Sequence, residues 1–275
     1  MKPVGISELL LYNTIKLETK TGAGTGFFFR YKIDDLMVPV IVTNKHVLNQ
    51  NPKETVRFLL HLSDDQGNDI NENYDVTFTA DWMFHPTQDI CITFANPLIE
   101  EVQQRTGKKV LYTAIDEELI YSEEKLKELS AIEKVTMIGY PTGLWDVLHN
   151  YPIIRNGFTA APPGYDFNQK STGLVDMACF PGSSGSPIFI LNENGYSDKN
   201  GNVYLGAKRI IFLGVLHSAP MMDVNGEIII VDIPTHQKAI TYSQAMINLG
   251  YYSKSYELLE FKEQIGAIVN ANKDK

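Results

Sequence analysis

The sequence predicts an all-β protein built from two β-rich halves, with a partly helical connector between them and a helical tail. Short apolar runs alternate with turns rich in Gly, Asn and Asp over residues 9–94, and the same pattern resumes at residue 134. Apolar residues at helical spacing occupy the stretches 116–129 and 239–272, and residues 98–105 could form one or two helical turns. Repeated short strands with turns of this kind are typical of a β-barrel or a β-sandwich.

The first half, residues 1–115, starts with a weakly alternating run and a glycine-rich bend at residues 22–26. A polar turn at residues 64–69 separates its later strands. The candidate strands cover residues 12–18, 27–31, 36–43, 56–62, 75–80 and 90–94.

Residues 116–133 form the expected connector between the halves. Apolar residues at helical spacing among many charges predict a helix on the surface. Such a charged segment could dock a regulatory protein partner, but a solvated helix is the simpler interpretation.

The second half, residues 134–238, returns to the β pattern. Asn200-Gly201 and Asn225-Gly226 are strong hairpin signals. The candidate strands cover residues 135–138, 153–160, 172–178, 186–191, 209–217 and 228–233. The tail, residues 239–275, has helical spacing with a break near Gly250.

Composition restricts the partners of the chain. Its 275 residues include 24 Lys and Arg against 33 Asp and Glu, a net charge of −9. No basic excess is available for nucleic acid or for an anionic membrane. The two cysteines, Cys91 and Cys179, lie in apolar runs and are expected to be reduced. The first residues lack the apolar run of a signal peptide, so a cytoplasmic location is expected.

The sharpest local motif is Pro181-Gly182-Ser183-Ser184-Gly185-Ser186-Pro187. Glycine permits a tight turn that can direct the N–H groups of Gly182 and Ser184 at one point. Two convergent N–H groups beside a serine hydroxyl suit an oxyanion in acyl transfer. A plain Gly/Ser turn is the alternative. A nucleophile elbow of the α/β-hydrolase type is excluded, because Ser186 stands where its second glycine is required.

A nucleophilic serine needs a base and a carboxylate that orients the base. His46 follows the apolar strand 38–42, and Asp89 opens the apolar run 90–94. Each residue alone could equally be structural. Together with Ser184 they occur in the order His, Asp, Ser, with the first two in one half and the serine in the other.

Four segments then resemble the trypsin-like serine peptidases of the chymotrypsin clan, in the style of the bacterial trypsin-2 and HtrA proteases. They are Gly24-Thr25-Gly26-Phe27, Thr43-Asn44-Lys45-His46-Val47, Asp89-Ile90-Cys91-Ile92 and Gly182-Ser183-Ser184-Gly185-Ser186-Pro187. Residues 138–143, 156–158 and 213–218 match less sharply. The resemblance implies two six-stranded antiparallel β-barrels of chymotrypsin type, a helical connector and a C-terminal helix. It also implies a serine endopeptidase with the triad His46, Asp89 and Ser184 and an oxyanion hole made by Gly182 and Ser184.

The sequence departs from the family pattern at two positions. Ser183 stands where digestive members carry an aspartate that pairs with a new N-terminus, so activation by N-terminal processing is not expected here. Ser186 replaces the usual second glycine and would crowd the turn if a positive φ were needed there.

The resemblance also points to substrate-binding residues. Ala178 lies where trypsin has an acidic pocket base, which argues against selection for Lys or Arg. His217 invites comparison with glutamyl-specific relatives, although its spacing from Gly214 is one residue longer. We expect a small or apolar side chain at the cleaved position. The backbone of His217, Ser218 and Ala219 is expected to pair with an extended protein or peptide substrate.

Two other functions remain open at this stage. One is a binding module that kept the fold and lost turnover, suggested by the altered loop at Ser183 and Ser186. The other is an esterase or acyl transferase with the same triad. No cofactor and no metal are expected, because His61 and His85 show no ligand spacing with the cysteines. The acidic stretch 64–72 is interpreted as a solvated turn rather than a calcium loop.

Overall fold

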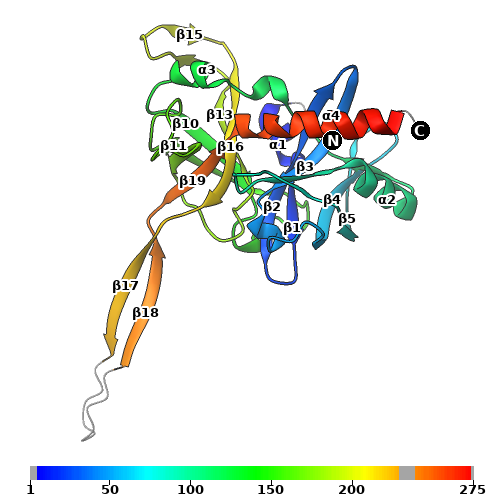
Figure 1. Ribbon diagram of the computed structural model, residues 1–275, viewed down its shortest axis with the longest axis horizontal. Coiled ribbons are helices and arrows are strands. Elements are labelled where there is room, and N and C mark those ends of the chain that lie inside the picture. The colour runs from blue at the N-terminus through cyan, green and yellow to red at the C-terminus, as the bar shows by residue number, and fades with distance from the viewer. Residues whose placement is uncertain (1–4, 229–238, 274–275) are drawn as a thin grey trace, which may run out of the picture.

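The computed structural model describes residues 5–228 and 239–273 of the chain (Figure 1). The N-terminal half is a nine-stranded sheet with strand order β5-β4-β1-β2-β3-β7-β6, in which β8 also pairs with β4 and β9 with β2. Its elements are α1 (Ile6–Leu11), β1 (Thr14–Glu18), β2 (Ala23–Ile33), β3 (Leu36–Thr43), η1 (His46–Leu48), β4 (Thr55–Ser63), β5 (Asp69–Thr79), β6 (Met83–Phe84), β7 (Cys91–Phe94), α2 (Asn96–Thr106), β8 (Lys109–Leu111) and β9 (Ile115–Asp116).

This sheet differs from the expected closed barrel. Its outer strands, β5 and β6, are joined by only residues 80–82, so the sheet must curve until its edges approach. The described ladders do not close it, because the two residues of β6 both pair with β7. The neighbouring Trp82 donates its N–H to Pro52 O instead of joining β5. The first half is therefore a strongly curved sheet whose described pairing remains open.

The C-terminal half contains the closed six-stranded antiparallel barrel that the sequence predicts. Its strands follow the order β10-β11-β12-β19-β16-β13 around the ring. A short connector precedes the barrel in the chain, and a small two-stranded hairpin is inserted between two of its strands. The elements are η2 (Glu117–Leu119), α3 (Glu123–Lys127), β10 (Lys134–Gly139), η3 (Pro141–Gly143), β11 (Ile153–Thr159), β12 (Thr172–Asp176), β13 (Pro187–Asn192), β14 (Gly195–Ser197), β15 (Val203–Leu205), β16 (Arg209–Ser218) and β19 (Leu249–Lys254).

The predicted helical tail is wrong over residues 239–254. The structure has β18 (Ala239–Met246) and the barrel strand β19 there, and helix starts only with η4 (Ser255–Glu260) and α4 (Phe261–Lys273). A Cβ at Gly250 would lie 2.5 Å from Cys179 Sγ, so this glycine permits close packing inside a strand. Tertiary pairing of β19 with β12 and β16 overrides the helical spacing.

The two predicted hairpin turns have different outcomes. Gly201, with φ +84°, turns the chain between β14 and β15, as expected. Asn225-Gly226 instead lies inside β17 (Met221–Ile228), where Asn225 pairs with Tyr242. Most of the predicted strand 228–233 lies outside the described residues. β17 and β18 form a two-stranded ribbon that projects from the body (Figure 1).

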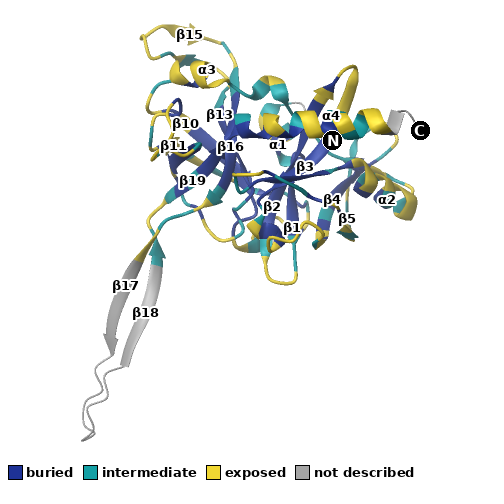
Figure 2. Cartoon of the chain, in the orientation of Figure 1, coloured by how far each residue is buried: buried dark blue, intermediate teal, exposed yellow. Residues whose placement is uncertain are grey.

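Strand β2 is buried on both faces, which explains its run of three phenylalanines. Phe28 packs into the core of the first half, whereas Phe27 and Phe29 face a second cluster that includes Phe212 of the barrel. Successive side chains of a strand point to opposite faces, so a strand between two cores reads as continuously apolar. Figure 2 shows this buried centre, with the partly exposed α4 running across its surface. Within the described part of the chain, no helix is both long and apolar enough to cross a bilayer.

Candidate active site

Strands β3 and β7 bring His46 and Asp89 together. They pair antiparallel with Thr43 opposite Cys91, so the residues just beyond this register meet at one edge. His46 Nδ1 lies 2.5 Å from Asp89 Oδ2, and the His46 N–H donates to Oδ1 at 3.2 Å. The Asn44 amide donates to Asp89 O at 2.6 Å. A carboxylate on Nδ1 fixes the tautomer whose Nε2 carries a lone pair for use as a base.

The serine loop, residues 182–186, is held between the two halves. The Thr25 N–H of β2 donates to Ser184 O at 2.9 Å, and its hydroxyl donates to Gly182 O at 2.9 Å. On the barrel side, Gly185 N–H donates to Leu216 O at 2.8 Å. Thr25 O accepts the Thr43 hydroxyl at 2.7 Å, which connects the serine loop to the strand that leads to His46.

Two glycines give this loop its shape. Gly182 has φ +88° and Gly185 has φ +86°, conformations that side chains strongly disfavour. A Cβ at Gly185 would lie 2.0 Å from Thr25 O. The loop can therefore approach β2 closely only with glycine at this position.

The backbone of the loop leaves two donors for a ligand. Ser183 N–H donates to Phe180 O at 3.0 Å, and Gly185 and Ser186 also have backbone acceptors. Among the described residues, the N–H groups of Gly182 and Ser184 have no backbone acceptor. Ser184 itself is half-buried, and no hydrogen bond joins it to His46 within the described structure. Hydrogen bonds of this kind are often long before substrate binds.

The two departures at Ser183 and Ser186 are both accommodated. Both side chains are fully buried, and neither hydroxyl has a hydrogen-bond partner in the described part of the chain. Ser186 does not have a positive φ. Its hydroxyl occupies the space above Gly139, where a Cβ would lie 2.0 Å away. Ser186 therefore fits because residue 139 has no side chain.

His217 lies at the edge of the site in a bulge of β16, where the pairing with β19 shifts between Leu216 and Ser218. Its ring is stacked on Tyr251, with ring centroids 6.4 Å apart, and its Nδ1 lies 2.9 Å from Ser218 Oγ. Burial lowers the pKa of the His217 imidazole; the charge of Asp89 opposes this shift and that of His46 adds to it. Burial therefore favours the neutral form of the His217 ring, which lies near Asp89 and His46.

A cavity of about 130 Å³ opens beside Ser184. Ser218 and Ala219 line it, whereas Ala178 and His217 do not. Sequence reasoning missed most of its apolar wall, and Met246 carried no signal because its segment reads as helical. The lining residues are Cys179, Phe180, Pro181, Ser184, Leu216, Ser218, Ala219, Met221 and Met246.

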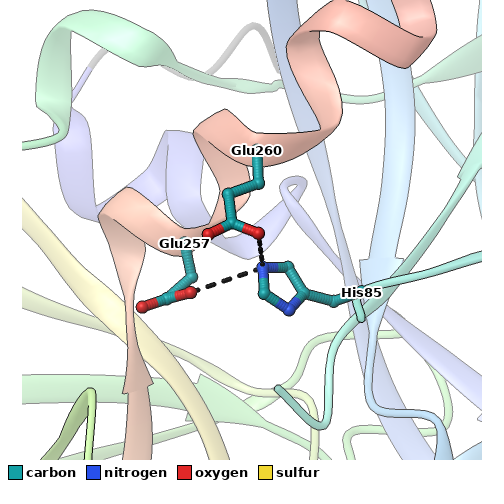
Figure 3. Close-up of side chains that lie close together, drawn as sticks. All are labelled: His85, Glu257 and Glu260. Carbon is teal, nitrogen blue, oxygen red and sulfur yellow. Dashed lines mark ion pairs between the residues drawn. The ribbon is translucent and has the colours of Figure 1, made fainter. Parts of the chain in front are cut away.

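A second group of titratable side chains lies apart from this cavity. His85, Glu257 and Glu260 place three potential metal-ligand atoms within 4.8 Å of one another (Figure 3). However, His85 Nδ1 accepts the N–H groups of Thr87 at 3.2 Å and Gln88 at 2.9 Å. The neutral ring then holds its proton on Nε2, and a protonated nitrogen does not ligate a metal.

In sequence comparisons the chain matches no protein-family model and no curated protein. Its structure is similar to three solved protease structures. The inactive form of the Rv3671c protease, from M. tuberculosis, has 17% identity and a TM-score of 0.44, covering 93% of this chain and 90% of that one. A scabies mite inactivated protease paralogue has 11% identity and a TM-score of 0.43, covering 93% of this chain and 95% of that one. A Glu endopeptidase has 14% identity and a TM-score of 0.43, covering 97% of this chain and 96% of that one. At these values, the function of the chain has to be judged from its own residues.

Proposed function

We propose that the chain is a serine endopeptidase that hydrolyses peptide bonds with His46, Asp89 and Ser184. The observation that carries this proposal is the attachment of the serine loop to the histidine strand. Ser184 O accepts from Thr25 N–H, and Thr25 O accepts from Thr43, three residues before His46. This attachment supports a site to which one half of the chain contributes the nucleophile and the other half an oriented base.

The reaction follows from these groups. Ser184 Oγ attacks the peptide carbonyl while His46 Nε2 takes its proton, and Asp89 stabilises the resulting imidazolium. The N–H groups of Gly182 and Ser184 bind the oxyanion, and each such donor contributes roughly 3 kcal/mol to the transition state. His46 then protonates the leaving amine, and water hydrolyses the acyl-enzyme by the same steps.

The cavity beside Ser184 favours an apolar side chain at the cleaved position. Its wall includes Leu216, Ala219, Met221 and Met246, and none of the described residues that line it is charged. An ionic side chain would lose its hydration there without gaining a partner. The backbone of residues 217–219 is proposed to pair with the extended substrate.

A fluorophosphonate probe tests the reactive serine. We expect the probe to label the wild type and Ser197→Ala, a control on the remote β14, but not Ser184→Ala. Equal labelling of Ser184→Ala would mean that another serine reacts. A folded wild type that takes no label would favour the binding module. Turnover of simple esters without turnover of any peptide would identify an esterase.

A peptide library tests the cavity. We expect cleavage after Leu, Met or Val rather than after Lys, Arg or Glu. Ala219→Leu fills part of the cavity and should lower kcat/KM for a Leu substrate by about tenfold or more, relative to an Ala substrate. An unchanged ratio would place the cleaved residue's side chain elsewhere.

A further inference from the structure

The turn that carries Asp89 is organised around the ring of His85. The His85 N–H donates to Ile90 O at 3.0 Å and closes the turn. Inside it, His85 Nδ1 accepts the N–H groups of Thr87 and Gln88, the two amides that precede Asp89. The imidazole therefore replaces the backbone acceptors that this turn lacks.

These hydrogen bonds determine what the other ring nitrogen can do. With its Nδ1 lone pair occupied, the neutral ring carries its proton on Nε2. Nε2 is completely buried and lies 3.0 Å from Glu260 Oε2 and 3.3 Å from Glu257 Oε2 (Figure 3). Neither contact has the geometry of a full hydrogen bond, so both are electrostatic contacts between the Nε2–H dipole and a carboxylate oxygen.

Both glutamates belong to η4, in the C-terminal segment after the last barrel strand. Glu257 is nearly buried, with 9% of its side chain exposed, whereas Glu260 is 56% exposed. The C-terminal part of the chain makes two further contacts with the turn. Ser253 Oγ donates to Gln88 Oε1 at 3.2 Å, and the Phe261 ring meets His85 edge-on at 5.6 Å.

A metal ion fits this cluster poorly. It would need the lone pair of Nε2, and the ring proton would then move to Nδ1. There it would point at the N–H groups of Thr87 and Gln88, which are themselves donors. The cluster is better matched to a protonated Nε2 between two carboxylates.

We propose that His85, Glu257 and Glu260 are positioning residues that fix Asp89 against His46. This inference rests on the proposed function of the His46 site. The C-terminal segment holds the ring of His85, the ring holds the two amides before Asp89, and Asp89 orients His46. Within the described residues, the other titratable groups near His46 include Lys45, its neighbour in the chain, and His217.

The first test removes the glutamate contacts in the full-length protein. Glu257→Gln and Glu260→Gln, combined, keep the size of both side chains and remove their charge. Glu263→Gln on α4 is the control, because that residue is exposed. We expect kcat/KM to fall about 10- to 100-fold in the double variant with KM nearly unchanged, since a small misplacement of a catalytic group has this effect. The control should match the wild type.

The pH profile separates positioning from simple stability. A displaced Asp89 stabilises the His46 imidazolium less, so the acidic limb of kcat/KM should move to lower pH in the double variant. The Nδ1 proton of His46, observed by NMR, should lose its downfield position. A double variant with wild-type kcat/KM, acidic limb and proton signal would overturn the proposal, and so would a loss of activity that only follows the unfolded fraction.

Two substitutions of His85 test its contact with the two amides and its contact with the two glutamates separately. His85→Asn retains an acceptor near Nδ1 but no donor that reaches the glutamates, whereas His85→Gln retains a donor near Nε2. Adding the glutamine pair to His85→Asn should change its activity little, because the contact with the glutamates is already lost. Adding the pair to His85→Gln should also change little, because that variant no longer accepts the amides of Thr87 and Gln88. A further loss of activity in both combinations, as large as the loss that the pair causes in the wild type, would contradict the proposed link.

One further result would overturn the positioning proposal, and another would refute only the proposed function on which it rests. Stabilisation of the wild type by added Zn²⁺ or Ca²⁺, absent in the glutamine pair, would mean that the cluster is a metal site. A wild type that takes no fluorophosphonate label would refute the proposed peptidase. The NMR signal of His46 would still test the positioning by itself, because it requires no turnover.

Discussion

The serine loop and the His46–Asp89 corner are connected through Thr25 and Thr43, but they are held in place by different kinds of contact. The serine loop is held by backbone groups, since Gly185 donates to Leu216 O and Ser184 O accepts from Thr25. The corner is held mainly by side chains. The Asn44 amide and the His85 ring support the turn that carries Asp89.

This difference predicts different weaknesses. Backbone groups keep their position through most substitutions, so the loop fails only where its φ angles or close approaches fail. A corner built from side chains can lose its geometry through one substitution far from the reacting atoms. The following three experiments test this contrast, starting with the largest expected effect.

Asp89→Asn should reduce kcat by about 10⁴-fold while the protein stays folded, because the amide no longer holds the imidazole in its working tautomer. Steady-state kinetics on a peptide substrate, together with thermal unfolding, measure both quantities. Asp81→Asn is the matched control, because that side chain is 88% exposed and pairs with Lys53. A comparable loss of activity in both variants would refute the role of Asp89.

Gly185→Ala should damage the loop through its backbone. The new Cβ meets Thr25 O at 2.0 Å in a residue with φ +86°, and we expect a loss on the order of 4 kcal/mol in unfolding free energy. Gly67→Ala separates the two causes, because φ is +79° there and no atom lies within 4 Å of the added Cβ. The free energy of unfolding of Gly67→Ala should fall by only about 1–2 kcal/mol. Equal losses by denaturant titration would show that the collision with Thr25 does not occur.

Acid should weaken the N-terminal half through His61, another buried side chain. Its ring packs against Tyr12, and burial lowers the pKa of His61 to about 4. Between pH 6.5 and pH 4 the unfolded chain therefore binds a proton at His61 that the folded chain does not bind. The free energy of unfolding falls as the pH decreases through this range. The total loss is on the order of 3 kcal/mol.

His61→Phe keeps an aromatic ring and removes this titration. Denaturant titrations at pH 7, 5 and 4 should show a shallower loss of stability in the variant than in the wild type. The same slope in both proteins would assign the acid sensitivity to other groups.

Much of the fold could be predicted from local patterns. The aromatic run that begins at Phe27 indicates a strand, and the repeated short strands indicate a barrel or a sandwich, whereas the six-stranded barrel is implied by the family resemblance. The prediction of a helix around Gly250 was wrong. A glycine in a helical pattern resembles a helix break, whereas Gly250 permits close packing of a strand against Cys179. Such packing depends on residues distant in sequence, which a local pattern does not contain.

The candidate site shows the same limit. The residue types around His46, Asp89 and Ser184 indicate nucleophilic chemistry, so the motifs alone identify the positions to examine. Sequence spacing did not suggest that His85 would meet Glu257, because the two lie in different halves of the chain. Met246 was missed for the same reason, since only the pairing with Met221 brings it to the cavity.

The position of Thr25 has a consequence for how the protein is made. This residue leaves the ribosome well before the loop that docks on it, which follows more than a hundred residues later, and β19 follows the loop. A nascent chain without β19 cannot close the barrel that supports the loop. Contacts so far apart in sequence also form late in folding. The proposed hydrolytic centre is therefore completed only after β19 has left the ribosome, so a shorter nascent chain cannot cleave its still unfolded neighbours.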